Sequence, residues 1–258
     1  MKLYKYSFFV FVLLGSAFFN LFLFFKAFSQ DVPKALNSSK DYVSIVKHYR
    51  YLNPDSALFF VKKGLKIAEK QRDELGRAAL LNQYGMIDDN ATRYKESREK
   101  YLQAETIYRA EGDDVGLAAV LVRLGVVEKR KGNYDKALAY FMKALTISEK
   151  NIHQLGMLEG RVVFAEAYYN LGDYKNALQN LLIAEQIDKQ IPLSNLSLNM
   201  YANFGQVYTK LGAYEKAIAY LKQGLSKSNR VDFNGLKINL LIELGATYFT
   251  MGENEQGI

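Results

Sequence analysis

Apolar and small residues recur along this chain at spacings of three and four residues, the spacing of one face of an α-helix. The clearest stretch is 124–147, in which two such faces are separated by Gly132 and Asn133. We expect Gly132 to form a turn with a positive φ, and Asn133 to cap the second helix through its side-chain oxygen. A single pair of amphipathic helices cannot bury its own apolar faces, so the pattern predicts neighbouring pairs that cover them.

The same pattern recurs with a step of forty residues, and a small residue marks each copy. These markers are Gly85, Gly125, Ala165, Gly205 and Gly245, and a small residue follows each of them twelve positions later, at Ser97, Ala137, Ala177, Ala217 and Gly257. Small residues let two helix backbones approach closely, while aromatic residues fill the space between layers. Copies in one register indicate a repeat array, so we interpret these residues as core and expect Ala137 and Ala177 to be buried.

Two copies, LVRLGVVEKRKGNYDKALAYFMKAL and YANFGQVYTKLGAYEKAIAYLKQGL, resemble the tetratricopeptide repeat, whose pattern is a large residue, Leu-Gly, Tyr, Gly-x-Tyr, Ala, Phe and Ala. The resemblance covers residues 38–258 and implies an all-α, tetratricopeptide-type helix-pair solenoid in a right-handed superhelix. It predicts eleven main helices, namely five pairs and an unpaired one. Two features depart from the family. The step is forty rather than about thirty-four residues, so each second helix or its following turn should be longer, and Trp is missing from the large-residue position.

The forty-residue step divides residues 38–258 into five units and a partial sixth. The units are 38–77, 78–117, 118–157, 158–197, 198–237 and the partial 238–258. The first unit is degenerate, with Ile45 at the marker position, as suits the end of an array. Asn53 and Pro54 should open its second helix, and Pro192 should lie at or beyond the end of a second helix.

Residues 1–29 have a different composition from the rest of the chain. Two lysines precede an uncharged apolar stretch at 7–25, and a small-residue cleavage pattern ends at Ser29. This pattern predicts a secretory signal peptide cleaved after Ser29. Because the stretch approaches the roughly twenty residues that span a bilayer, an uncleaved membrane anchor is the alternative. Either way we expect export, to a periplasmic or other extracytoplasmic location, with residues 30–37 as a short linker.

The remaining composition excludes several classes of function. The formal net charge is +7, and the three lysines before residue 30 leave +4 for the mature chain. Positive and negative residues are interspersed along the predicted helices, so the sequence lacks the basic stripe of a nucleic-acid-binding protein. The absence of cysteine excludes disulfides, cysteine-ligated metals and thiol catalysis.

No pattern in the chain indicates an enzyme, a cofactor or a metal site. The only histidines, His48 and His153, lie far apart, and no carboxylate–histidine spacing resembles a metal motif. No glycine-rich phosphate loop follows a strand, because no strand is predicted. We therefore predict a protein without catalytic residues, and reproducible turnover by the purified array would overturn this prediction.

The resemblance instead implies binding, because the first helix of each tetratricopeptide pair lines a concave groove. The groove positions hold Asn82, Gln83, Arg123, Arg130, Glu166, Tyr169, Asn170, Asn203, Gln206 and Lys210. Amide and guanidinium groups there can pair with the backbone or carboxylates of an extended peptide. The alternative is that these residues are merely solvated. The clamp with which some family members hold a C-terminal carboxylate needs Lys and Asn one turn apart, and the matching positions here lack that combination.

We therefore predict an exported, non-enzymatic scaffold that binds a protein or peptide partner. The alternative is the extracytoplasmic input region of a truncated bacterial signalling protein, a sensor histidine kinase or a helix-turn-helix regulator. The partial sixth unit should leave an apolar face without its second helix, namely Leu240, Leu241, Leu244, Tyr248 and Phe249. We expect the native gene product to continue beyond Ile258, and the chain that ends at Ile258 to self-associate through its C-terminal end.

Overall fold

A computed structural model of the chain describes residues 36–229 and 234–252, and every regular element in these ranges is a helix. The helices are α2 (Ser39–Leu52), α3 (Pro54–Gln71), α4 (Glu74–Asn90), α5 (Tyr94–Glu111), α6 (Asp114–Arg130), α7 (Tyr134–Lys150), α8 (Gln154–Asn170), α9 (Tyr174–Asp188), α10 (Asn195–Lys210), α11 (Tyr214–Ser228) and α12 (Asn234–Met251). These eleven helices form five consecutive pairs followed by α12, which confirms the predicted all-α helix-pair solenoid. The predicted signal peptide and most of the predicted linker lie outside the described residues.

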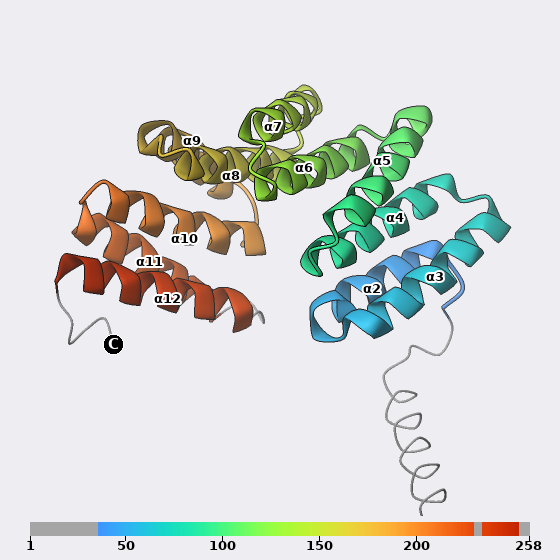
Figure 1. The fold of residues 1–258 in the computed structure, drawn as a ribbon, viewed down its shortest axis with the longest axis horizontal. Coiled ribbons are helices and arrows are strands. Elements are labelled where there is room, and N and C mark those ends of the chain that lie inside the picture. Colours follow the sequence, from blue (N-terminus) through green and yellow to red (C-terminus); the bar gives the residue numbers. More distant parts are fainter. Residues whose placement is uncertain (1–35, 230–233, 253–258) are drawn as a thin grey trace, which may run out of the picture.

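The pairs follow one another along an arc (Figure 1). Each first helix packs against the next first helix, from α2 and α4 through to α10 and α12. Each second helix packs against its own partner and the following first helix, whereas neighbouring second helices within the described residues do not contact one another. Neighbouring first helices contact one another and neighbouring second helices do not, so the solenoid curves toward the side of the first helices. The first helices therefore form its concave face, and the second helices lie behind it. Figure 1 shows α5, α7 and α9 on the outer side of the arc.

The turns within and between pairs show which capping predictions hold. Gly132 adopts φ +80°, as predicted for the turn before α7. Asn53 caps α3, since its side chain accepts a hydrogen bond from the Ser56 backbone N–H at 3.0 Å. The prediction for Asn133 is wrong in its mechanism. Asn133 occupies the N-cap position of α7 but makes no side-chain cap bond, because its Nδ2 donates to the buried Glu128 Oε2 at 2.7 Å instead.

The core follows the predicted forty-residue register. Ala137 and Ala177 are completely buried, which confirms the prediction for both residues. Ser97 and Ala217, at the equivalent positions of two further repeats, are completely buried as well. Four positions after each of these four small residues, a large second-helix side chain is also fully buried, namely Tyr101, Phe141, Leu181 and Leu221. Tyr101, Phe141 and Leu221 pack directly on the backbone of a first helix at its small marker residue, so each large side chain fills the space that the glycine leaves open.

The helix pairs begin earlier than the predicted units. The second unit was placed at 78, but α4 begins at Glu74, and α6 likewise begins at Asp114 rather than near 118. In this pair the first helix, α4, has 17 residues and the second helix, α5, has 18. An aspartate fixes each of these starts, because Asp73 and Asp113 accept a backbone N–H of the first turn. Pro192 lies beyond the end of α9, as predicted.

The helix α12 leaves part of its apolar face uncovered. The prediction that the missing second helix leaves Leu240 in an exposed apolar face is wrong: Leu240 is fully buried, because α12 packs on α10 and α11. In contrast, Leu241 is 50% exposed and Phe249 is 66% exposed. Ile238 and Ile242 on the same face are exposed by 55% and 61%. The described helices include none that combines the length and apolar character needed to cross a membrane.

Candidate functional site

The concave face carries the residues that were predicted to line a groove, and contacts between neighbouring first helices hold many of them. On the α2–α4 boundary, Arg50 Nη1 donates to Gln83 Oε1 at 2.7 Å and lies 3.0 Å from Met86 Sδ. On the α4–α6 boundary, Arg130 Nη1 lies 3.0 Å from Asp89 Oδ1 and donates to the Asp89 carbonyl oxygen at 3.2 Å. Both contacts link residues on successive first helices.

Two ion pairs join α6 to α8 in the middle of the concave face. Arg123 pairs with Glu159, and Lys129 pairs with Glu166. Burial alone would lower the pKa of Arg123, but the nearby acidic groups, led by Glu159, raise it on balance, so the guanidinium stays charged. Glu166 also lies 3.4 Å from the amide of Asn203 on α10, which extends the polar chain to the next helix.

Neutral and acidic groups continue this series of polar contacts across α10 and α12. Gln206 Nε2 donates to Glu243 Oε1 at 2.6 Å, and the hydroxyls of Thr209 and Thr247 lie 2.9 Å apart. Of the other predicted groove residues, Asn170 and Lys210 are exposed at the ends of α8 and α10. Tyr169 is half-buried, and burial raises the pKa of its phenol.

Several of the predicted groove residues are therefore not simply solvated. Gln83, Arg123, Arg130, Glu166 and Gln206 each hold a partner on a neighbouring first helix. The prediction that they contact a peptide stays a prediction, and such a peptide would have to exchange with these internal partners. Sequence reasoning missed the partners themselves, namely Arg50, Asp89, Lys129, Glu159 and Glu243. The available signal was the recurrence of complementary polar residues about one repeat apart.

One section of the concave face contains buried polar atoms without a hydrogen-bond partner. Within the described residues these atoms include Arg50 Nε on α2 and Asn82 Oδ1 on α4. Asp89 Oδ1 makes no hydrogen bond but is ion-paired with Arg130 at 3.0 Å. The Tyr101 hydroxyl, on the neighbouring outer helix α5, is also buried without a hydrogen-bond partner. Burial raises the pKa of the Asp89 carboxyl, although the charges of Arg130 and Arg123 act in the opposite direction. Burial likewise raises the pKa of the Tyr101 phenol well above its usual range. This section therefore holds polar groups whose bonding capacity the fold leaves unused.

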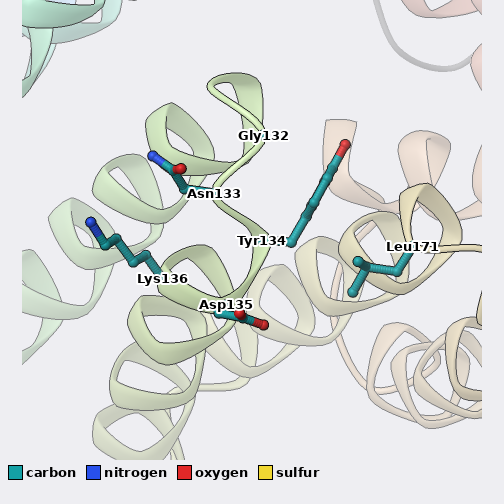
Figure 2. A pocket seen from close by; sticks show the side chains of 6 residues that line it. All are labelled: Gly132, Asn133, Tyr134, Asp135, Lys136 and Leu171. Carbon is teal, nitrogen blue, oxygen red and sulfur yellow. The ribbon is translucent and has the colours of Figure 1, made fainter.

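A shallow pocket of about 320 Å³ lies away from the concave face, between the α6–α7 and α8–α9 turns. It is lined by Gly132, Asn133, Tyr134, Asp135, Lys136 and Leu171. Figure 2 shows the Tyr134 ring between its own turn and Leu171, whereas Asn133 and Lys136 point to the other side. The polar groups do not converge on one point, so we interpret this pocket as the joint between two turns. The described residues also contain no cluster of three or more metal-ligating side chains.

Comparison with known proteins supports the repeat assignment. A sequence model of the family described as Tetratricopeptide repeat matches residues 76–150 and 161–230, which together make up more than half of the chain. No curated protein sequence matches the chain.

Solved structures share the fold at low sequence identity. BtubC from P. vanneervenii has a TM-score of 0.64 at 16% identity, covering 81% of this chain and 86% of its own. NprR, solved in complex with its cognate peptide NprX, has a TM-score of 0.62 at 14% identity, covering 99% of this chain and 74% of its own. A signal transduction ATPase with a tetratricopeptide repeat sensor, from Pyrococcus horikoshii, has a TM-score of 0.61 at 21% identity. The match covers 85% of this chain but only 34% of that protein.

Proposed function

Since the chain belongs to the tetratricopeptide repeat family, we propose that it is a non-enzymatic scaffold that binds a protein or peptide on its concave face. The observation that carries this proposal is the continuous row of amide, guanidinium and carboxylate groups across the first helices from α2 to α12. An extended peptide presents alternating N–H and C=O groups, which such a row can satisfy. The complex of NprR with its peptide supports this use of the fold.

Selection from a display library of short random peptides tests the proposal. The purified full chain should enrich related peptide sequences. Replacing Asn203 and Gln206 by Ala should weaken the binding of these peptides, because the row loses two amides. The control Arg109→Gln changes an exposed side chain on the outer helix α5 and should leave binding unchanged. Failure to enrich any peptide, or equal losses in the control, would argue against a concave binding face.

We also propose that the protein is exported, because residues 1–29 have the composition of a signal sequence. N-terminal sequencing of protein from a membrane-free periplasmic extract should begin at Gln30. Membrane-bound protein that begins at Met1 would instead support the uncleaved anchor.

The alternative proposal is an input region of a bacterial signalling protein. It rests on the combination of an export signal with a forty-residue tetratricopeptide step. A membrane-spanning segment encoded downstream of residue 258 in the native gene would favour it over a free scaffold. A stop codon directly after that position would argue against it.

A further inference from the structure

The turns that connect one helix pair to the next lie along one edge of the solenoid, where second helices end and first helices begin. At the α7–α8 and α9–α10 connections this edge is apolar. Gln154 Nε2 donates to Gln190 Oε1 at 3.4 Å, which brings the two connections together. We call their apolar side chains the apolar joint patch, namely Ile152 (76% exposed), Leu155 (46% exposed), the half-buried Ile191 and the exposed Pro192.

The apolar joint patch has no charged side chain of its own. No Asp, Glu, Lys or Arg occurs at 151–158 or at 190–209, whereas the α3–α4 connection contains charged residues of both signs. The carboxylate of Asp114, which borders the patch, accepts a hydrogen bond from Asn151 Nδ2 at 3.0 Å. An exposed surface that is both apolar and uncharged favours burial in an apolar medium.

The backbone at Ile152 indicates that the patch has a use beyond folding. Ile152 adopts φ +50°, a left-handed conformation that is unfavourable for a β-branched residue. Gly112 occupies the equivalent position one repeat earlier, at φ +68°. Because Ile152 is exposed, packing within the described part of the chain does not compensate for this conformation. Contact with a partner outside the fold explains an isoleucine at this position.

The N-terminal part of the chain indicates which partner this edge meets. The described residues begin on the same edge, since Gln71 Nε2, at the end of α3, donates to the Asn37 carbonyl oxygen at 2.8 Å. The uncharged apolar stretch 7–25 comes before this point, and the ten residues 26–35 reach at most about 35 Å when extended. Such a stretch inserts into a membrane, either transiently as an export signal or permanently as an anchor. Both uses bring this edge of the array to a lipid surface.

We infer that the apolar joint patch docks reversibly on a lipid bilayer, with Ile152 and Leu155 inserted at the boundary between headgroups and acyl chains. This inference goes beyond the proposed peptide binding, because the patch lies at the edge of the array and not on its concave face. Apolar side chains at a bilayer surface contribute through the area that they bury. The patch contains no basic residue to attract anionic headgroups, so a neutral bilayer is sufficient. Docking through a few side chains is weak, so a cleaved protein remains extractable.

Site-specific fluorescence on the full chain tests the inference, because the sequence contains no cysteine. Leu155→Cys, labelled with the environment-sensitive dye nitrobenzoxadiazole, should shift its emission to the blue when phosphatidylcholine vesicles are added. The matched control is Leu211→Cys, which is 45% exposed at the opposite edge, where α10 ends, and should not shift. No shift at position 155, or equal shifts at both positions, would overturn the inference. A shift that requires anionic lipid would do the same, and so would one that appears without vesicles as the protein concentration rises, since a second copy would then cover the patch.

Ile152→Gly in the labelled chain supplies a second test. It should weaken vesicle binding about tenfold or more, because the docked surface loses an aliphatic side chain. It should also raise the urea midpoint, since Gly accepts the positive φ without strain. A lower urea midpoint would show that Ile152 packs within the fold, and unchanged vesicle binding would show that it does not reach the bilayer. Either result would overturn the inference. Neither readout involves the concave face, so this inference and the proposed peptide binding fail independently.

Discussion

The ring of Phe141 on α7 lies directly against the backbone of Gly125 on α6, so closely that a Cβ at position 125 would be 2.4 Å from Phe141 Cε1. Real Cβ atoms do not approach other heavy atoms this closely, so the glycine is required by its neighbour. Tyr101 packs on Gly85 in the same way. The core of this solenoid is therefore built from matched pairs of one small and one large residue.

Gly125→Ala should destabilise the array by about 1–2 kcal/mol. The added methyl group overpacks the contact with Phe141, which outweighs the gain in helix propensity of roughly 1 kcal/mol. Urea unfolding followed by circular dichroism measures the change. The next repeat supplies the compensating combination, because Ala165 and Leu181 occupy the equivalent positions and both are fully buried.

The double variant Gly125→Ala/Phe141→Leu reproduces that natural combination. It should lose less stability than the sum of the two single changes, with a coupling of about 1 kcal/mol. Strictly additive losses would show that the ring of Phe141 does not limit the residue at position 125.

The sequence predicted the fold because the packing rule repeats. Each small marker residue and its large packing partner recur every forty residues. The helix-pair interpretation of one repeat could therefore be checked against the other repeats of the same chain. The cap at Asn133 was mispredicted because the sequence does not show that a buried Glu128 competes for its side chain. Leu240 was mispredicted because a first helix also packs on the preceding pair, which covers one side of α12 even without a second helix.

The candidate site was less predictable than the fold. The forty-residue step placed Arg123 and Gln206 on the correct helices. It could not show that Arg123 pairs with Glu159, or that Gln206 donates a hydrogen bond to Glu243. Such contacts depend on side-chain reach across two helices, which the repeat pattern does not specify. One local signal was present in the sequence. Tyr101 carries the only hydroxyl in a series that continues as Phe, Leu and Leu.

Tyr101→Phe should raise the free energy of unfolding by about 1 kcal/mol in the absence of a ligand. A buried hydroxyl without a partner costs roughly 1–3 kcal/mol, and Phe fills nearly the same volume. Urea unfolding measures the gain. The matched change Tyr140→Phe, at a partly exposed position on α7, should have little effect. A loss of stability in Tyr101→Phe would mean that the hydroxyl is bonded within the fold.

Stability at alkaline pH should depend on Tyr220. Burial, together with the negative charge of Glu185, raises the pKa of its phenol to about 12. The folded state therefore holds this proton more tightly than the unfolded state, whose phenol has a pKa near 10. The resulting stabilisation is complete below about pH 10 and is lost as the pH rises toward 12. Tyr220→Phe should flatten this part of the decline, as measured by urea unfolding at a series of pH values. An unchanged slope would show that Tyr220 does not contribute.

The uncovered face of α12 should hold two copies of this chain together. Ile238, Leu241, Ile242 and Phe249 form this face, and no charged side chain is among them. In antiparallel contact, Ile238 of one copy would lie near Phe249 of the other, and Ile242 near the small Gly245. Pairing α12 with itself therefore brings these apolar side chains together. Stacking it on the other end of the array would instead bury the exposed polar residues of α2, such as Lys40 and Lys47.

Light scattering on the full chain should accordingly give a dimer. Phe249→Asp should shift it to a monomer, because the interface would then bury an unpaired charge. Met142→Asp is the matched control, since Met142 is 56% exposed on the outer helix α7 and should not affect association. A monomeric unmodified chain, or equal effects of the two aspartates, would contradict pairing through α12.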